Sequence, residues 1–219
     1  MKFIPILLAI LLIAATVVYL KNRMGPGSLS RQRLTLEQKL ELLAECGLEL
    51  AVPFTFDDLL LSFDREEFEA PGFDVVLFGL AMVEEEEPCR NHCANLWHFD
   101  TECIEGSGSY TRIAERMVEM SQGALVLDNI KDYVDIEEEE AWLSFTFHGE
   151  PIKIAYTVDD DWVDAKVFDK FVELLGVADP SKVYIADTSG GGQDMLIGCV
   201  TKEQLERLNS YGLKFAPWT

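Results

Sequence analysis

The feature that most constrains this chain is an uninterrupted apolar run near its beginning. Residues 3–20 (FIPILLAILLIAATVVYL) contain no charged side chain, and a helix of that length rises about 27 Å, enough to cross the hydrocarbon core of a bilayer. A cleaved signal peptide is the alternative, but Ala14 and Ala15 are followed by more apolar residues rather than by a clean cleavage site. We therefore expect a single transmembrane anchor, with its flanking residues, at 1–23.

The residues around the apolar run bear on its orientation. Only Lys2 precedes it, and the basic residues that follow favour a cytoplasmic domain by the positive-inside rule. Periplasmic proteins, however, also begin with a short basic segment and an apolar run. We expect the inner membrane of a bacterium and leave the side of the domain open. Gly25, Pro26 and Gly27 cannot continue a helix, so residues 24–34 are expected to be a flexible linker.

Charge is very unevenly distributed along the chain. Residues 1–33 contain five basic residues and no acidic one, which leaves 13 basic against 39 acidic residues in 34–219, a net charge of −26. Such a surface repels nucleic acid and attracts basic proteins. The sequence therefore predicts no nucleic-acid binding and favours a basic protein partner.

Beyond the linker, the pattern of apolar residues predicts an acidic domain at 35–219, with a small helical lobe at 35–88 and a main lobe at 89–219 as its possible subdivision. A capping-box pattern from Thr35 to Gln38 predicts a helix at 36–48. Residues 73–83 are too uniformly apolar to distinguish a strand from a helix. Alternating apolar residues predict a hairpin from 141–147 and 152–158.

The other expected elements are a strand at 95–104, a helix at 111–122, a helix capped by Asp164, a hairpin from 183–187 and 195–200, and a final helix after Thr201. This order predicts an α+β fold. We expect an antiparallel or mixed sheet with helices packed on one face, preceded by one N-terminal transmembrane helix.

Three cysteines and two histidines lie within fifteen residues: Cys89, His92, Cys93, His98 and Cys103. Their spacing suits zinc, but in a strand His98 and Cys103 point to opposite faces. We therefore favour structural roles and expect no metal site and no cofactor. In a periplasmic domain Cys89 and Cys93 would instead form a disulfide; the sequence leaves their state open.

Strand alternation places His98, Asp100 and Glu102 on one face. A histidine flanked by carboxylates suits acid–base catalysis or metal binding, so a metal-dependent hydrolase is an alternative function. No nucleophile or second histidine is tied to these residues by the sequence, and we favour a solvated strand face and a protein without enzymatic activity.

Acidic clusters are the best candidates for partner binding. Runs occur at 84–87 and 137–140, and Trp162 follows three consecutive aspartates. The aspartates fit a calcium loop poorly. We select as candidate partner-binding residues Glu84, Glu85, Glu86, Glu87, Asp159, Asp160, Asp161 and Trp162, with Trp142 as a further exposed aromatic candidate.

Several segments carry a family resemblance: 96–104 (LWHFDTECI), 132–135 (DYVD), 141–145 (AWLSF), 161–164 (DWVD) and 193–198 (QDMLIG). In these segments the chain resembles a group of uncharacterised bacterial proteins similar to the immunity proteins that accompany secreted polymorphic toxins. The resemblance covers about 34–219 and implies no catalytic residues. It implies a membrane-anchored binding protein that neutralises a toxin by direct contact. A membrane-tethered scaffold component is a further alternative.

Overall fold

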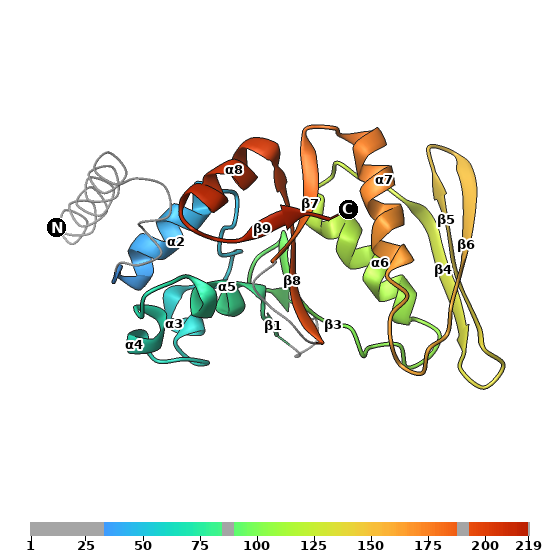
Figure 1. Cartoon of the computed structure of the whole chain (residues 1–219), viewed down its shortest axis with the longest axis horizontal. Coiled ribbons are helices and arrows are strands. Elements are labelled where there is room, and N and C mark those ends of the chain that lie inside the picture. Colours follow the sequence, from blue (N-terminus) through green and yellow to red (C-terminus); the bar gives the residue numbers. More distant parts are fainter. Residues whose placement is uncertain (1–32, 85–89, 188–192, 219) are drawn as a thin grey trace. The chain divides into compact units, whose positions relative to one another are not determined.

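The computed structural model describes residues 33–84, 90–187 and 193–218 (Figure 1). The described residues divide into two compact units: those from 33 to 97 with 203–215, and those from 98 to 202 with 216–218. The predicted anchor and nearly all of the predicted linker lie outside the described residues. Within the described ranges, no helix is long and apolar enough to cross a membrane.

The first unit is mainly helical. Its helices are α2 (Leu36–Ala44), α3 (Phe56–Leu59), α4 (Arg65–Phe68), α5 (Asp74–Ala81) and α8 (Lys202–Ser210), and β1 (Val83–Glu84) pairs with β2 (Arg90–Asn91) in an antiparallel ladder. Helix α2 begins with the predicted capping box: Gln38 N donates to Thr35 Oγ1 over 3.3 Å, and Thr35 N donates to Gln38 Oε1 over 3.0 Å. It ends at Ala44, four residues before the predicted end.

The apolar segment 73–83 is largely the helix α5, packed against α2 and α4. Gly79 allows close approach of α4, because a Cβ there would lie only 3.2 Å from the Phe68 ring. Lys39, only 2% exposed, donates from Nζ to the carbonyl oxygens of Phe68 at 2.7 Å and Ala70 at 2.5 Å. This buried lysine therefore satisfies carbonyl groups at the end of α4, and burial lowers its pKa.

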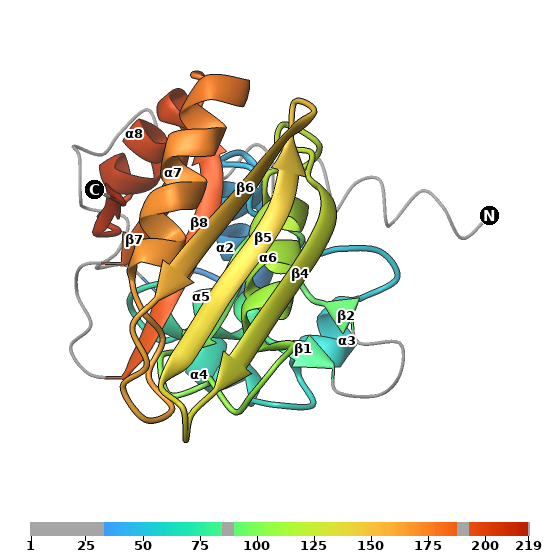
Figure 2. The same cartoon turned by 90° about the vertical axis from the view of Figure 1, so that its right-hand side faces the viewer.

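The second unit has three layers. Helices α6 (Ser109–Met120) and α7 (Lys166–Ala178) lie between a three-stranded sheet in the order β4-β5-β6 and a four-stranded sheet in the order β3-β8-β7-β9 (Figures 1 and 2). Aromatic contacts join the layers: Phe171 of α7 packs on Phe145 of β5, and Phe168 packs on Phe99 of β3. Helices thus cover one face of each sheet, and the predicted α+β fold with antiparallel pairing is confirmed.

The three-stranded sheet consists of β4 (Asp128–Asp135), β5 (Glu140–Phe147) and β6 (Glu150–Tyr156). The predicted 141–147/152–158 hairpin is confirmed as β5 and β6, and alternation decides its faces. Leu143 and Phe145 are buried against the helices, whereas Trp142, Ser144 and Thr146 lie on the outer face. Strand β4, which the sequence did not predict, pairs with β5 and is mostly exposed and polar.

Strand β4 carries the cap of helix α6. Both carboxylate oxygens of Asp132 accept the Gly108 amide, at 2.8 and 2.9 Å, and Oδ2 also accepts the Thr111 amide at 3.1 Å. The first amides of a helix have no partner within the helix, and a negative charge there is favourable. A side chain from the sheet therefore supplies the cap that the residues preceding α6 lack.

The four-stranded sheet contains β3 (Leu96–Asp100), β7 (Lys182–Asp187), β8 (Asp194–Thr201) and β9 (Phe215–Pro217). Its β7–β8 pair matches the second predicted hairpin. Strand β3 ends at Asp100, four residues before the predicted end, and β9 was not predicted. Tyr184 of β7 donates its hydroxyl to the Met117 carbonyl of α6 over 2.6 Å, which ties this sheet to the helical layer.

Candidate protein-binding surface

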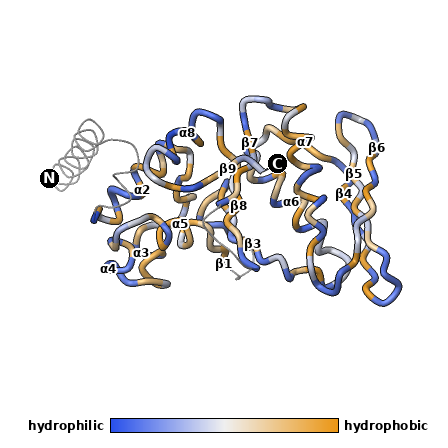
Figure 3. The backbone as a smooth tube through the Cα atoms, in the orientation of Figure 1, coloured by the Kyte–Doolittle hydropathy of each residue, from blue (hydrophilic) through white to orange (hydrophobic). Residues whose placement is uncertain are grey.

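One end of the three-stranded sheet brings three of the acidic residues selected from the sequence, Asp159, Asp160 and Asp161, to the same end as the acidic run 137–140. Ala141 pairs with Val134 of β4 and with Tyr156 of β6, so the β4–β5 turn and the segment after β6 leave the sheet at the same end. Figure 3 shows the turn as strongly hydrophilic. We call this surface the acidic end and define it as Asp135, Glu137, Glu138, Glu139, Glu140, Asp159, Asp160 and Asp161.

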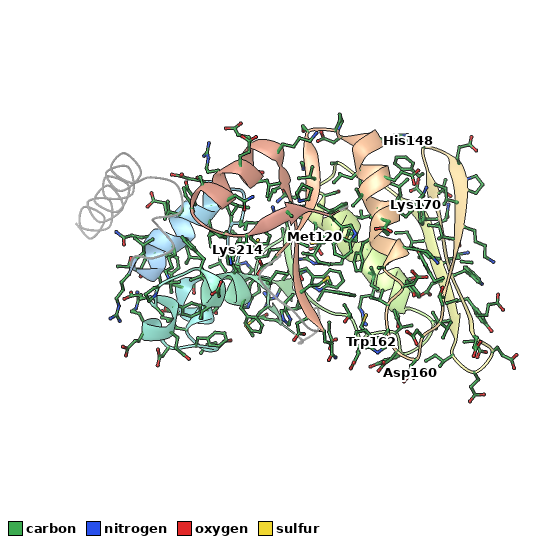
Figure 4. All side chains as sticks on the ribbon, in the orientation of Figure 1. Met120, His148, Asp160, Trp162, Lys170 and Lys214 are labelled. Carbon is green, nitrogen blue, oxygen red and sulfur yellow. The ribbon has the colours of Figure 1, made fainter. Side chains whose placement is uncertain are left out.

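Trp162 lies at the acidic end on a loop held by backbone hydrogen bonds. Its amide donates to the Asp159 carbonyl at 3.0 Å, the Val163 amide donates to Thr101 at 2.9 Å, and the Ile104 amide donates to Asp161 at 2.9 Å. Asp160 adopts a positive φ of 51° in the turn. Figure 4 shows Asp160 and Trp162 together, with His148 at the opposite end of the sheet. The indole is therefore presented from a fixed backbone.

Asp164 closes the same loop. Its carboxylate accepts the Thr157 amide at 2.8 Å and the Lys166 amide at 3.0 Å, at the beginning of α7. Asp164 thus caps α7 as the sequence predicts, although it lies one residue before the formal cap position, Ala165. Burial alone would raise the pKa of Asp164, but these hydrogen bonds and the Lys166 ammonium outweigh burial and lower it.

Exposed apolar side chains accompany the acidic residues. Trp162 is 42% exposed, Tyr133 38% and Ile136 37%. Ile136 lies in the β4–β5 turn and Tyr133 lies two residues before Asp135, to which its hydroxyl donates over 3.3 Å. The charge of Asp135 raises the pKa of Tyr133, as expected in a negative local field. Exposed aromatic groups within a charged rim are typical of protein interfaces.

The sequence had selected only part of this surface. It selected Asp159, Asp160, Asp161 and Trp162, but it gave no reason to join them to the run 137–140 or to Tyr133 and Ile136. The missing signal was strand β4, whose pairing with β5 brings the two acidic segments to one end of the sheet.

The other selected acidic run belongs to the first unit. Glu84 ends β1, and its Oε2 forms an ion pair with Arg90 Nη2 at 2.7 Å. Glu85, Glu86 and Glu87 lie outside the described residues. The first unit thus contributes no described geometry to the acidic end, and partner binding by residues 84–87 stays a prediction.

The three residues of the alternative hydrolase site are His98, Asp100 and Glu102, and the histidine contacts a different partner from the two carboxylates. Gln193 Nε2 donates to Asp100 Oδ1 at 3.0 Å and to Glu102 Oε2 at 2.7 Å, so one amide bridges the two carboxylates. His98 Nε2 lies 3.7 Å from Asp194 Oδ1 instead. Within the described ranges, no group of three or more histidine, cysteine or acidic side chains is arranged to hold a metal ion.

The cysteine and histidine cluster is divided between the two units. In the first unit, His92 is buried, its Nδ1 lies 2.9 Å from the Gly79 carbonyl oxygen, and its ring packs on Phe54. Cys93 is buried and donates to Asn95 Oδ1 at 3.2 Å. His98 and Cys103 belong to the second unit. Cys89 lies outside the described residues, so the alternative of a Cys89–Cys93 disulfide stays open.

The geometry of the acidic end suits recognition of a positively charged surface. It combines exposed carboxylates with three partly exposed apolar side chains, Tyr133 near the end of β4, Ile136 in the β4–β5 turn and Trp162 on its hydrogen-bonded loop. Exposed apolar groups beside a charged rim are typical of protein interfaces rather than of clefts. Comparisons with protein-family models, with curated proteins and with solved structures find no match to this chain.

Proposed function

We propose that this chain is a membrane-anchored, non-enzymatic binding protein that captures a basic protein through the acidic end of its second unit. The observation that carries the proposal is Trp162, which is exposed on a loop fixed by backbone hydrogen bonds and directly follows three aspartates. Together with the sequence resemblance described above, this supports an immunity protein that neutralises a bacterial toxin by direct binding.

Charge supports the first step of binding. Residues 98–202 contain 22 acidic and 8 basic residues, a net charge of −14. A surface of this kind accelerates encounter with a basic partner at low ionic strength. Free carboxylates at the rim add little lasting affinity, because exposed ion pairs contribute only about 0–1 kcal/mol. The charges therefore govern capture rather than retention.

Apolar contacts support retention. A tryptophan at the centre of an interface is a common hot spot, and its truncation typically costs about 2 kcal/mol or more. Backbone hydrogen bonds that involve the carbonyl groups of residues 101, 159 and 161 already hold the loop of Trp162. Little conformational entropy is therefore lost when a partner binds. This arrangement requires no bound cofactor or reacting group.

The function is tested by expressing the candidate toxin, the product of the neighbouring gene, with and without this protein. We expect growth arrest by the toxin alone and rescue by the full chain. A product that is harmless alone, or equally toxic in both strains, would refute toxin neutralisation.

The surface is tested with variants in the same assay. Trp162→Ala and the pair Asp159→Asn with Asp160→Asn should lose protection and weaken binding of the purified proteins. Matched controls are Val177→Ala, an exposed apolar residue of α7, and Glu115→Gln, an exposed acid of α6. Controls as damaging as the test variants would show that the acidic end is not the binding surface.

The anchor is proposed from residues 3–20 alone. Membrane fractionation of the full chain, compared with a variant lacking residues 3–20, tests it. We expect the full chain in the membrane fraction after a high-salt wash and the shortened chain in the soluble fraction. A reporter joined after Thr219 reports the side of the membrane.

A further inference from the structure

The outer face of the three-stranded sheet has a chemistry unlike the rest of this acidic chain. The register places Lys131 and Lys153 directly opposite Ser144, on either side of it, in one cross-strand row. The neighbouring row holds Tyr133 and Trp142, stacked with ring centres 6.0 Å apart. Figure 2 shows this face toward the viewer, with α6 and α7 behind it and no described element in front.

A hollow of about 340 Å³ lies over the lysine row. Its polar lining includes Lys131, Lys153, Ser144, Thr146 and Asn129, and no carboxylate is among the described residues that line it. Asn129 Nδ2 donates to Thr146 Oγ1 at 3.3 Å, and Ser144 Oγ donates to the Lys131 carbonyl at 3.3 Å. Two lysines, a serine, a threonine and an asparagine thus line one open space.

Neither lysine is neutralised by a carboxylate within ion-pair distance among the described residues. The described ion pairs of the second unit involve other cations, such as Lys166 with Asp164 and Lys170 with Glu173. Lys153 Nζ instead lies 3.9 Å from the centre of the Trp142 ring. A cation–π contact at an exposed site is weak, so the ammonium can turn toward a stronger anionic acceptor.

The acidic end does not cancel this local positive charge. Ser144 is four residues from Glu140 along β5, about 13 Å at the usual rise of a strand. Mobile ions screen charges beyond about 8 Å at physiological ionic strength. A small anion in the hollow therefore meets the two lysines and, among the acidic residues, chiefly Asp128, which lies opposite Thr146 in the register. An extended anionic surface, such as a membrane, would also meet the acidic end.

We propose that this hollow binds a small phosphorylated metabolite, with the phosphate dianion between Lys131 and Lys153 above Ser144. A phosphate has three acceptor oxygens for the two ammonium donors, while the Ser144 hydroxyl donates to the Lys131 carbonyl. The organic part would lie toward Tyr133 and Trp142. The lysine row lies outside the acidic end, and Tyr133 borders both surfaces.

The test uses the full chain purified in a mild detergent, with glucose 6-phosphate as the probe and glucose as the uncharged control. Titration calorimetry should show saturable binding of glucose 6-phosphate and none of glucose. In two-dimensional NMR spectra, the amide signals of Lys131, Ser144 and Lys153 should shift. No saturable binding below about 10 mM, or equal binding of glucose, would overturn the proposal.

Single variants identify the donors. Lys131→Gln and Lys153→Gln should each weaken binding about tenfold or more, as expected for loss of a charged hydrogen bond. Lys202→Gln, an exposed lysine outside this sheet, is the matched control and should change the affinity less than twofold. An equal loss of affinity in all three variants would show that binding depends only on net charge, and it would overturn the proposed site. A phosphoserine peptide that binds more tightly than the sugar phosphate would overturn the assignment to a small molecule.

Discussion

The cap that Asp132 provides for helix α6 gives the sharpest test of how the second unit is held together. Its carboxylate accepts two backbone amides, those of Gly108 and Thr111, over 2.8–3.1 Å. Loss of a side-chain cap typically costs about 1 kcal/mol, and loss of a negative charge at a helix N-terminus about 0.3–1 kcal/mol more. We therefore expect Asp132→Ala to lower the free energy of unfolding by about 2 kcal/mol.

A conservative variant separates the two contributions. Asp132→Asn keeps an acceptor oxygen but removes the charge, so its expected cost is about 1 kcal/mol. Asp128→Ala is the matched control, because Asp128 lies on the same strand, is exposed and makes no side-chain hydrogen bond to any described residue. Its expected cost is below about 0.5 kcal/mol.

The assay is urea unfolding followed by circular dichroism, with amide hydrogen exchange as the local measurement. A loss of 2 kcal/mol shifts the midpoint by about 1 M urea at a typical slope of about 2 kcal/mol per molar. The amides of the first turn of α6 should exchange faster in Asp132→Ala. If this variant is as stable as Asp128→Ala and its α6 amides remain protected, the long-range cap is wrong.

Four further predictions rest on other features of the two units. Replacing the buried Lys39 by Met should destabilise the first unit by about 2 kcal/mol, because two carbonyl groups lose their donor; urea unfolding with exposed Lys202→Met as control tests this. Asp164 has a lowered pKa in the fold, so its contribution is present at neutral pH and lost as the pH falls through that pKa. Stability measured from pH 6 to pH 2 should therefore fall less steeply in Asp164→Asn than in the unchanged chain. Burial raises the pKa of Cys103 to about 11, so iodoacetamide at pH 8 should label it more slowly than a model thiol, as read by mass spectrometry; equal rates would refute this. If the acidic end captures a basic partner, a higher salt concentration should lower the association rate constant much more than it changes the dissociation rate constant, as measured by surface plasmon resonance.

Much of the fold could be predicted because local patterns and tertiary packing agree. The alternation from Ala141 to Phe147 matches a strand with one face on helices, and the stripe from Val167 to Leu175 matches a helix packed between sheets. The capping box at Thr35 is another local signal, since all of its partners lie within four residues. Such elements can be recognised from a short stretch of sequence alone.

The missed elements depend on partners far away in the chain. Strand β4 has a weak alternation because one of its inward positions is Asp132, which caps α6 rather than packing in a core. Segment 73–83 is apolar on all sides, so only its contacts with α2 and α4 distinguish a helix from a strand. Strand β9 has only three residues. The sequence also contains no signal that α8 returns to the first unit.

Only the part of the candidate surface that lies in one short segment, residues 159–162, could be selected from the sequence. An aromatic residue after three aspartates is visible in the sequence, whereas the approach of residues 135–140 requires the β4–β5–β6 register. His92 was ambiguous because burial, not spacing, decides its role; in the structure it packs on Phe54 and lies beside the Gly79 carbonyl.

The return of residues 203–215 to the first unit also sets an order of events during synthesis. Domains generally fold from the N-terminus as the ribosome releases them. Here the first unit begins first but lacks α8 until nearly the whole chain has been made. The second unit, contiguous from 98 to 202 apart from residues 216–218, has most of its chain available earlier. We therefore expect the second unit to fold first on the ribosome. The helices of the first unit would complete their packing only after α8 has been synthesised.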